Sequence, residues 1–240
     1  MQIDDQVFKT RPFGHQLEAL KLSRDAQVYA LLMEMGTGKS KLMIDTTAWL
    51  FSQGRVDGLV IIAPKSVYTG WVDKQLPDHM PDSVPYKAVL WGPDTKTFKR
   101  KLGELFTYEP LVLHVLVMNI DAVIADRGYE VLEKFLRSHS AIIGVDESTI
   151  IKNPTSARTK VLTKLGKLAK YRRIMTGSLI ANYPLDSYAQ FNFLEDGLLG
   201  CSSFYAFRNH YAVLRKRHIN GRSFDEIVGY QRLDELQRHL

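Results

Sequence analysis

The octet MEMGTGKS, residues 33–40, follows the apolar run Val28–Met33 and precedes a stretch with helical spacing. A strand, a glycine-bearing loop and a helix in this order are typical of a phosphate-binding loop. Gly36 and Gly38 allow successive backbone N–H groups to face phosphate oxygens. The predicted helix has one apolar face, made of Leu42, Met43, Thr46, Trp49 and Leu50. Its N-terminus would point at the bound anion, so the octet predicts a nucleotide-binding site.

Within the octet, Lys39 would place its charge at the β- and γ-phosphates, and the Ser40 hydroxyl would ligate Mg²⁺. Met33 stands where the general pattern has its first glycine. The predicted nucleotide-binding residues of the loop are Met33, Glu34, Met35, Gly36, Thr37, Gly38, Lys39 and Ser40. The structural alternative is a glycine-bearing turn in which Lys39 is merely solvated.

Length and composition exclude several classes of protein. The 240 residues are 45% hydrophobic and 24% charged, which is ordinary for a globular protein. Cys201 is the single cysteine, and no Cys and His cluster has metal-ligand spacing. Apolar runs such as Leu59–Pro64 are far shorter than the roughly 20 residues of a membrane span. The first ten residues do not resemble a signal peptide, so we expect a cytoplasmic protein without a membrane partner.

The net charge of +6 permits a polyanionic partner without proving one. Basic residues cluster at 96–101, 164–173 and 208–222. The last cluster is the best candidate for nucleic acid, because Phe207, Tyr211 and His218 interleave with its charges. Each cluster could equally be a solvated face.

Short apolar runs alternate with amphipathic segments along the chain. The predicted strands are 28–33, 59–64, 86–91, 113–120, 141–146 and 172–178. Such alternation predicts an α/β fold, with a mostly parallel sheet and helices on both faces. The strand pattern fades after about Gly200. We therefore expect a main domain at 1–200 and a helical or irregular appendage at 201–240.

The run Ala141–Val145 ends abruptly in two acids, Asp146 and Glu147. In a buried parallel strand, side chains at the carboxyl end lie at the edge of the sheet where ligands bind. Asp146 would hold the Mg²⁺ shell, and Glu147 would orient and deprotonate the attacking water. Alone, the pair could be two solvated acids at a strand end. The phosphate-binding loop upstream favours the functional interpretation.

Thr176, Gly177 and Ser178 end the last predicted strand. Small hydroxyl residues next to the catalytic carboxylates could form hydrogen bonds that change with the presence of the γ-phosphate, and so could couple the nucleotide site to another surface. Without the other motifs, this tripeptide would be only a turn.

Five segments together carry a resemblance to a known family: RPFGHQLEAL, MEMGTGKS, IIAPKSVYTGW, DESTIIKNPTSARTK and RRIMTGSLIANYPLDSYAQFNFL. In this order they resemble the motifs of the first RecA-like P-loop NTPase domain of superfamily-two helicases, in the Swi/Snf-like branch. The resemblance covers roughly residues 8–235. The compact form is similar to helicases encoded by bacteriophages and prophages.

The resemblance implies roles for single residues. Gln16 would bind the adenine edge with Arg11 nearby, and ATP and Mg²⁺ would be the cofactors. Asp146 and Glu147 match the Mg²⁺ ligand and the catalytic base. Thr176 and Ser178 match residues that couple ATP to DNA. The residues that match DNA contacts are Lys65, Ser66 and Asn119. Ser148 and Thr149 depart from the family, which usually has alanine or glycine followed by histidine.

The family resemblance further implies an ATP-dependent motor that moves on duplex or branched DNA, with strand separation as its alternative. In the family, ATP is hydrolysed between two RecA-like domains, so a second domain is an expected partner. We expect a monomer that, as half of the catalytic unit, binds Mg-ATP weakly and hydrolyses it slowly. Two other classes stay open: a P-loop phosphotransferase, and a nucleic-acid-binding module with a vestigial ATP site.

Overall fold

A six-stranded parallel sheet forms the centre of the molecule in the computed structural model, which describes residues 7–107, 109–177, 184–219 and 222–240. The strand order is β1-β6-β5-β2-β4-β3. The strands are β1 (Val28–Leu32), β2 (Gly58–Ala63), β3 (Tyr86–Leu90), β4 (Leu113–Asn119), β5 (Ala141–Asp146) and β6 (Tyr171–Thr176). Five match a predicted strand to within a residue at either end, and β6 ends two residues before the predicted strand 172–178, so the predicted α/β fold is confirmed.

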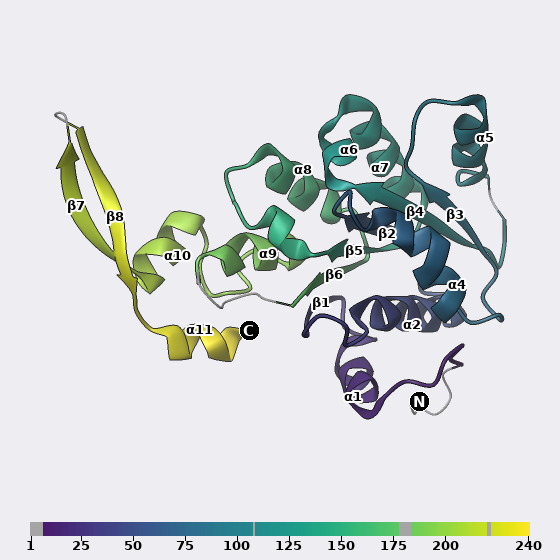
Figure 1. Cartoon of the computed structure of the whole chain (residues 1–240), viewed down its shortest axis with the longest axis horizontal. Helices are drawn as coiled ribbons and strands as arrows, with labels where there is room; N and C mark the ends of the chain where they lie inside the picture. The colour runs from purple at the N-terminus through teal and green to yellow at the C-terminus, as the bar shows by residue number, and fades with distance from the viewer. Residues whose placement is uncertain (1–6, 108, 178–183, 220–221) are drawn as a thin grey trace.

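Helices cover both faces of this sheet (Figure 1). One layer holds α1 (Gly14–Ser23), α2 (Lys39–Ser52), α3 (Tyr68–Gly70), the π-helical turn η2 (Trp71–Gln75) and α4 (Leu76–His79). The other layer includes α5 (Lys96–Glu104), α6 (Ile120–Ile124), α7 (Asp126–Ser138), α8 (Ala157–Gly166) and α9 (Asp186–Leu194). Among the described residues, no helix is long and apolar enough to span a membrane.

The alternation of side chains along the strands creates two hydrophobic cores. In β2, Val60 and Ile62 face one core, while Leu59, Ile61 and Ala63 face the other, and all five are fully buried. A strand that is buried on both faces reads as a continuous apolar run, which is why β2 shows no alternation in the sequence.

Parallel pairing brings the motifs to one edge of the sheet. β1 pairs with β6, with Leu32 opposite Thr176, and β6 pairs with β5, with Met175 opposite Asp146. The carboxyl ends of these three strands therefore lie side by side, although more than a hundred residues separate β1 from the other two along the chain. This edge is where ligands bind in open α/β sheets.

The segment after Gly200 differs from the helical appendage that we expected. The helices α10 (Phe204–Tyr211) and α11 (Leu233–His239) are present, but an antiparallel hairpin, β7 (Ala212–Ile219) and β8 (Arg222–Tyr230), lies between them. The prediction is wrong for the hairpin. Most of the ribbon is exposed on both of its faces, so its strands carry no buried stripe from which a period of two could be read.

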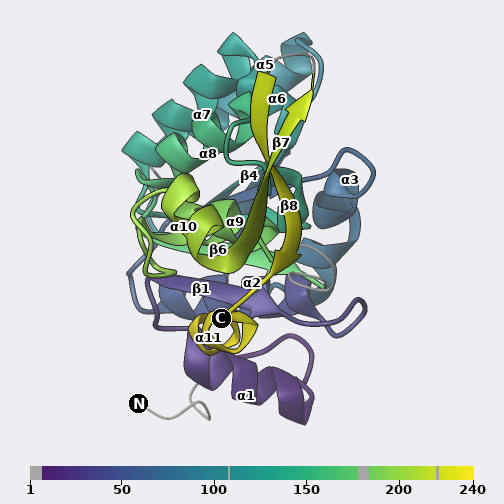
Figure 2. The same ribbon diagram turned by 90° about the vertical axis from the view of Figure 1, so that its left-hand side faces the viewer.

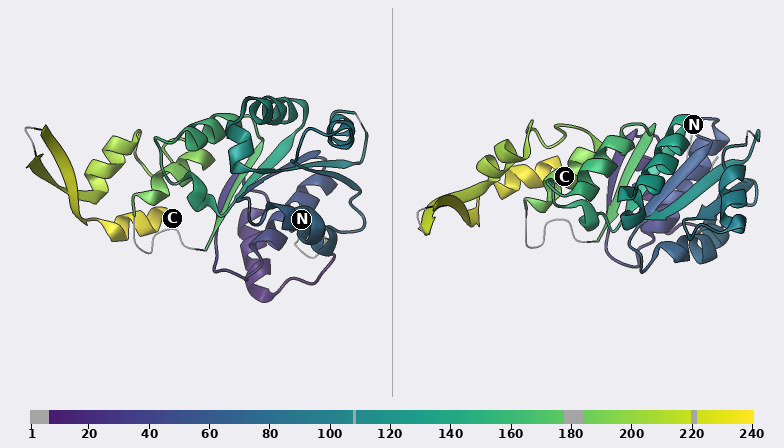
Figure 3. Two further views of the ribbon diagram at one scale, coloured as in Figure 1. Left: turned by 45° about the horizontal axis from the view of Figure 1, so that its top comes forward. Right: turned by 90° about the horizontal axis from the view of Figure 1, so that it is seen from above.

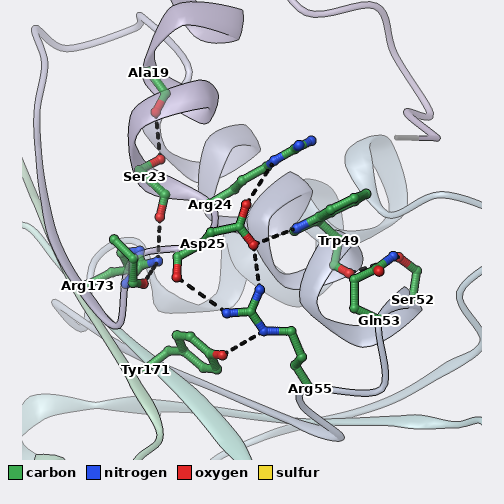
Figure 4. Close-up of polar contacts among 11 residues, drawn as sticks. Ala19, Ser23, Arg24, Asp25, Trp49, Ser52, Gln53, Arg55, Tyr171 and Arg173 are labelled. Carbon is green, nitrogen blue, oxygen red and sulfur yellow. Dashed lines mark hydrogen bonds and ion pairs between the residues drawn. The ribbon is translucent and has the colours of Figure 1, made fainter. Parts of the chain in front are cut away.

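The helix α1 is fixed to the sheet by Arg173 of β6, a fully buried side chain (Figure 4). Its guanidinium donates to the carbonyl oxygens of Ser23 and Ala26 at 2.8 and 2.7 Å, and to those of Gln27 and Arg172 at 3.2 and 2.8 Å. Burial lowers the pKa of Arg173 to about 10, so it remains a cation at neutral pH. These bonds satisfy carbonyl groups at the C-terminal end of α1.

A second polar cluster joins the same region to α2. The Asp25 carboxylate accepts from the Trp49 indole at 3.2 Å and from the Arg55 guanidinium, which also donates to the Tyr171 hydroxyl at 2.8 Å (Figure 4). The Arg24 guanidinium lies 4.0 Å from the centre of the Trp49 ring. These contacts fix the C-terminal part of α2 to the segment between α1 and β1.

Candidate functional site

The loop between β1 and α2 has the backbone shape that an anion-binding loop requires. Gly36 has φ +79° and Gly38 has φ +95°, a region that residues with a Cβ rarely adopt. Gly38 also caps α2, whose first turn holds Lys39 and Ser40. A Cβ on Gly38 would lie 2.3 Å from Nε2 of Gln16, so the close approach of α1 disfavours any larger residue here.

The Lys39 side chain is nearly buried in the mouth of this loop, with 8% of its surface exposed. Its ammonium donates to the carbonyl oxygens of Met33 at 2.9 Å and Glu34 at 3.1 Å. The Thr37 hydroxyl also donates to the Glu34 carbonyl, at 2.7 Å. These bonds hold a positive charge at the centre of the loop, where a phosphate would sit.

The acid pair stands at the end of β5, facing the same space. The indole nitrogen of Trp71 donates to Oδ2 of Asp146 at 2.9 Å, and the backbone N–H of Glu147 donates to Oδ1 at 3.0 Å. Burial raises the pKa of Asp146, while these two hydrogen bonds and the charge of Lys39 act in the opposite direction. The carboxylate is therefore oriented at both oxygens.

Glu147 is one of the few described residues other than glycine with a left-handed backbone, at φ +46° and ψ +60°. Such a conformation costs about 1 kcal/mol or more and is concentrated at functional sites. It turns the chain from β5 into the 3₁₀ turn η3 (Ser148–Ile151) and leaves Glu147 at the wall of the cleft. The strained turn thus presents the predicted base to the ligand space.

These elements enclose a cleft of about 740 Å³. Of the residues predicted from sequence, it is lined by Met35, Gly36, Gly38, Lys39, Ser40, Ser66, Asp146 and Glu147. Its opposite wall is made by the segment that follows β2, which contributes Val67, Thr69, Gly70, Trp71, Lys74, Gln75, Asp78 and His79. The phosphate-binding residues and the acid pair therefore share one space.

Trp71 and Lys41 also line the cleft, although no sequence pattern indicated that they would. Trp71 stands in one of the family-like segments, where it received no role, although a buried indole N–H needs an acceptor. Lys41 lines the cleft, but its ammonium is bonded to buried Asp45 at 2.7 Å. Burial raises the pKa of that carboxyl to about 6. No signal in the sequence identifies Lys41 as a structural lysine.

The residues present fit a magnesium nucleotide. A hydroxyl on Ser40 and a carboxylate on Asp146 are oxygen donors of the kind that Mg²⁺ binds. No group of three or more His, Cys, Asp or Glu residues in the described part of the chain could hold a metal by itself. Phosphate oxygens would complete such a shell, as is usual for Mg²⁺.

The predicted coupling segment contacts the loop directly. The backbone N–H of Met33 donates to the Thr176 carbonyl at 3.2 Å, and Gly177 lies beside Met35, where an added Cβ would make an ordinary contact at 3.4 Å. Thr176 itself is buried. Ser178 lies outside the described residues, so its role stays a prediction.

Ser148, the first departure from the family pattern, is used structurally. Its hydroxyl donates to Oε1 of Gln190 in α9 at 2.6 Å, and both side chains are fully buried. A second bond joins Lys152 to Asp186 at the start of α9, at 3.0 Å. The turn after the acid pair is thus tied to the helix that follows the coupling segment.

The two residues predicted near adenine have different surroundings. Gln16 is buried, and its amide joins α1 to the loop, because it donates to the Thr37 carbonyl at 2.9 Å and accepts from the N–H of Phe13 at 3.0 Å. Arg11 is exposed and does not line the cleft. Their contact with adenine stays a prediction.

The three predicted DNA contacts follow β2 and β4 at the same edge of the sheet. Lys65 and Ser66 are exposed, and Ser66 also lines the cleft. Oδ1 of Asn119 accepts from the N–H of Ala122 at 3.0 Å and so caps α6. Asn119 thus has a structural role, and a contact of its side-chain amide with DNA stays a prediction.

Comparison with known families shows to which family the chain belongs. Residues 15–236 match the SNF2-related domain family, which is almost the whole chain and includes every motif of the cleft. The chain is a member of the SNF2-related family. The resemblance to the Swi/Snf-like branch of superfamily two, which was drawn from its motifs, is thereby confirmed; a phage origin stays a prediction.

Individual relatives of this SNF2-related chain are distant. "Protein CHROMATIN REMODELING 24" of Arabidopsis thaliana is 24% identical over 238 residues, which are 96% of this chain and 21% of that protein. "TATA-binding protein-associated factor 172" of Homo sapiens is 31% identical over 96 residues, covering 40% of this chain and 5% of that protein. The SNF2-related chain therefore spans only a small part of the curated relatives.

Solved structures confirm the fold of the SNF2-related domain. The Sulfolobus solfataricus SWI2/SNF2 ATPase core in complex with dsDNA superimposes with a TM-score of 0.67 at 20% identity. The Sulfolobus solfataricus SWI2/SNF2 ATPase core domain gives 0.58 at 22% identity. Each match covers 88% of this chain and 41% of the other, and at this identity it supports the fold.

Proposed function

We propose that this chain is an ATP-binding motor domain that uses Mg-ATP to move on double-stranded or branched DNA. The observation that carries the proposal is the convergence of Lys39, Ser40, Asp146 and Glu147 on one cleft, whose loop is bonded to Thr176 of the coupling strand. Membership of the SNF2-related family supports this function. The Sulfolobus ATPase core was solved in complex with dsDNA, which supports DNA as the track.

The predicted site residues have chemical tasks in this proposal. The loop N–H groups and Lys39 would bind the β- and γ-phosphates, and Ser40 and Asp146 would hold Mg²⁺, which would neutralise phosphate charge. Glu147 orients a water molecule and accepts its proton. Gln16 reads the adenine edge. Because the backbone of Met33 is bonded to that of Thr176, a movement of the phosphate-binding loop would move the end of β6, and with it α9.

Other functions have less support. A P-loop phosphotransferase would need no Gln16 contact to the loop and no coupling strand. A vestigial site would not be expected to retain a strained Glu147 at the cleft wall. Movement on intact DNA and strand separation remain alternatives within the proposal, as do a second RecA-like domain as partner, a monomeric state and a cytoplasmic location.

Equilibrium binding tests the proposal on this chain directly. A fluorescent ATP analogue should bind in the presence of Mg²⁺, and Lys39→Ala should weaken that binding because the central charge of the loop is lost. A labelled DNA duplex should bind with an affinity that falls steeply as salt rises. Absence of both interactions in the folded chain would overturn the proposal.

Removal of the Trp71 indole N–H is expected to weaken Mg²⁺ use. Trp71→Phe keeps a ring in the core but leaves Oδ2 of Asp146 without its donor. Loss of such an orienting partner costs about 10- to 100-fold in metal affinity or activity. The Mg²⁺ concentration that half-saturates nucleotide binding should therefore rise, whereas binding of ATP without Mg²⁺ should stay unchanged.

Trp49→Phe is the matched control for Trp71→Phe. Its indole also donates to a carboxylate, Asp25, but it lies outside the cleft. An equal Mg²⁺ requirement for both variants would show that the Trp71 contact does not position Asp146.

A further inference from the structure

The β7–β8 hairpin extends away from the body of the molecule (Figures 1 and 3). Only its base is packed: Ala212 is buried, and Leu214 and Tyr230 lie partly buried against the core. Strands of eight and nine residues give the ribbon a length of roughly 25 Å. A two-stranded ribbon is marginally stable by itself, so its exposed part needs an explanation other than packing.

Positive charge is concentrated on β7. Arg215, Lys216, Arg217 and His218 follow one another, and all four are exposed. The two acids of β8 are already paired, because Asp225 lies 3.3 Å from Arg208 and Glu226 lies 3.0 Å from Arg217. The register places Glu226 and Asp225 opposite Arg215 and Lys216, but within the described part of the chain no carboxylate lies within 4.0 Å of either cation. Their charges are therefore available to a partner.

Apolar side chains are exposed beside these charges. The strand register places Phe224 opposite Arg217 and Glu226 opposite Arg215, and these four side chains share one face. Phe224 is 46% exposed. An exposed aromatic ring between arginines is suited to a sugar or base beside phosphates.

The hairpin extends from one side of the body. In Figure 2 it stands in front of the body, whereas the strands run across the view and the carboxyl end of β1 points to the right. The nucleotide cleft lies at the carboxyl edge of the sheet, with Lys65 and Ser66 after β2.

We propose that the β7–β8 hairpin is a second DNA-contacting surface, in which Arg215 and Lys216 bind phosphates and Phe224 lies against a sugar or base. The inference rests on the proposed DNA motor function and adds a contact outside the motor cleft. Lys216 and Arg215 point to opposite faces of the ribbon. A ribbon of this kind fits the major groove of a duplex, where phosphates border it on both sides.

The test compares two double variants of the chain. Arg215→Gln with Lys216→Gln removes the unpaired charges of the hairpin. Lys96→Gln with Lys101→Gln is the matched control, since it removes two exposed charges from α5, at the opposite end of the molecule (Figure 1). In the described part of the chain neither lysine lies within 4.0 Å of a carboxylate. Dissociation constants for labelled duplex, single-stranded and branched DNA are measured at several salt concentrations.

The hairpin variant should bind duplex DNA roughly tenfold more weakly at low salt. The slope of log affinity against log salt should become about 1.8 units shallower, because two phosphate contacts are lost. Phe224→Ala should weaken binding without changing that slope. The control variant should match the parent chain, and Mg-ATP binding should be equal in all of them.

Two outcomes would overturn the inference. If the hairpin variant keeps the affinity and salt slope of the control while Lys65→Ala weakens DNA binding, the hairpin is not a contact and the motor proposal stands. If polyglutamate displaces DNA from the parent but not from the hairpin variant, and both bind DNA equally, the surface fits an acidic protein instead. A parent chain that binds no DNA would end both proposals.

Discussion

Glu147→Gln is expected to lower the rate of ATP hydrolysis by about 10²- to 10⁴-fold, the usual contribution of a positioned general base. The amide keeps the size of the side chain and its place at the cleft wall, but it cannot accept a proton from water. Binding of Mg-ATP should be unchanged, because Lys39, Ser40 and Asp146 are untouched. Single-turnover hydrolysis with the chain in excess over ATP measures the rate even if turnover is slow.

Glu130→Gln is the matched control for Glu147→Gln. Glu130 is an exposed glutamate of α7 that does not line the nucleotide cleft, so its replacement should leave hydrolysis at the parent rate. Equal rates for parent and Glu147→Gln would show that Glu147 is not the base. A site that binds ATP but never hydrolyses it, in any variant, would support the vestigial alternative.

Arg173→Met should lower the free energy of unfolding by about 3 kcal/mol. The methionine keeps part of the buried stem but has no donors. The Ala26 carbonyl oxygen then loses its guanidinium donor, while those of Ser23 and Gln27 keep only the backbone N–H groups of Ala26 and Arg172. A buried acceptor left without a donor costs about 1–3 kcal/mol, and relief of the desolvated charge offsets part of the sum. Urea unfolding followed by circular dichroism measures the change.

Arg172→Met is the control for this stability effect, because Arg172 is the preceding residue of β6 and points to the opposite face of the sheet. It is only half-buried, so the loss should be clearly smaller. Arg173→Met should also weaken nucleotide binding, since α1 carries Gln16 to the loop. Equal stability of the two variants would mean that Arg173 does not anchor α1.

The sheet could be predicted from the sequence because its strands are buried on both faces. Val60, Ile62 and their neighbours form uninterrupted apolar runs, and parallel strands of this kind leave little ambiguity. The nucleotide loop could also be predicted. Gly36 and Gly38 have left-handed backbone conformations that glycine adopts readily, so the residue types themselves indicate the loop.

The hairpin and the wall of the cleft could not be predicted in the same way. The exposed ribbon carries no buried stripe, so its cations resembled a solvated helix face. Trp71 reaches Asp146 across 75 positions of sequence, and Arg173 reaches Ser23 across 150. Such long-range polar contacts depend on the order of strands in the sheet, which no local pattern contains.

The departure at Ser148 shows how a local rule can mislead. Ser148 and Thr149 stand where the family usually has alanine or glycine followed by histidine, yet Ser148 is bonded to Gln190 of α9. The helix α9 follows the coupling strand β6 along the chain. The Ser148–Gln190 bond therefore connects the segment after the acid pair to the segment after that strand. The difference at Ser148 and Thr149 therefore replaces the family's histidine without separating the acid pair from α9.

The most direct test of the central claim is the steady-state ATPase rate of the protein expressed from its whole reading frame. The rate is measured without DNA and with single-stranded, duplex or branched DNA, for the parent and for Glu147→Gln. We expect duplex or branched DNA to stimulate the parent rate and Glu147→Gln to abolish the stimulated rate. A parent rate that is the same with and without every DNA would contradict it.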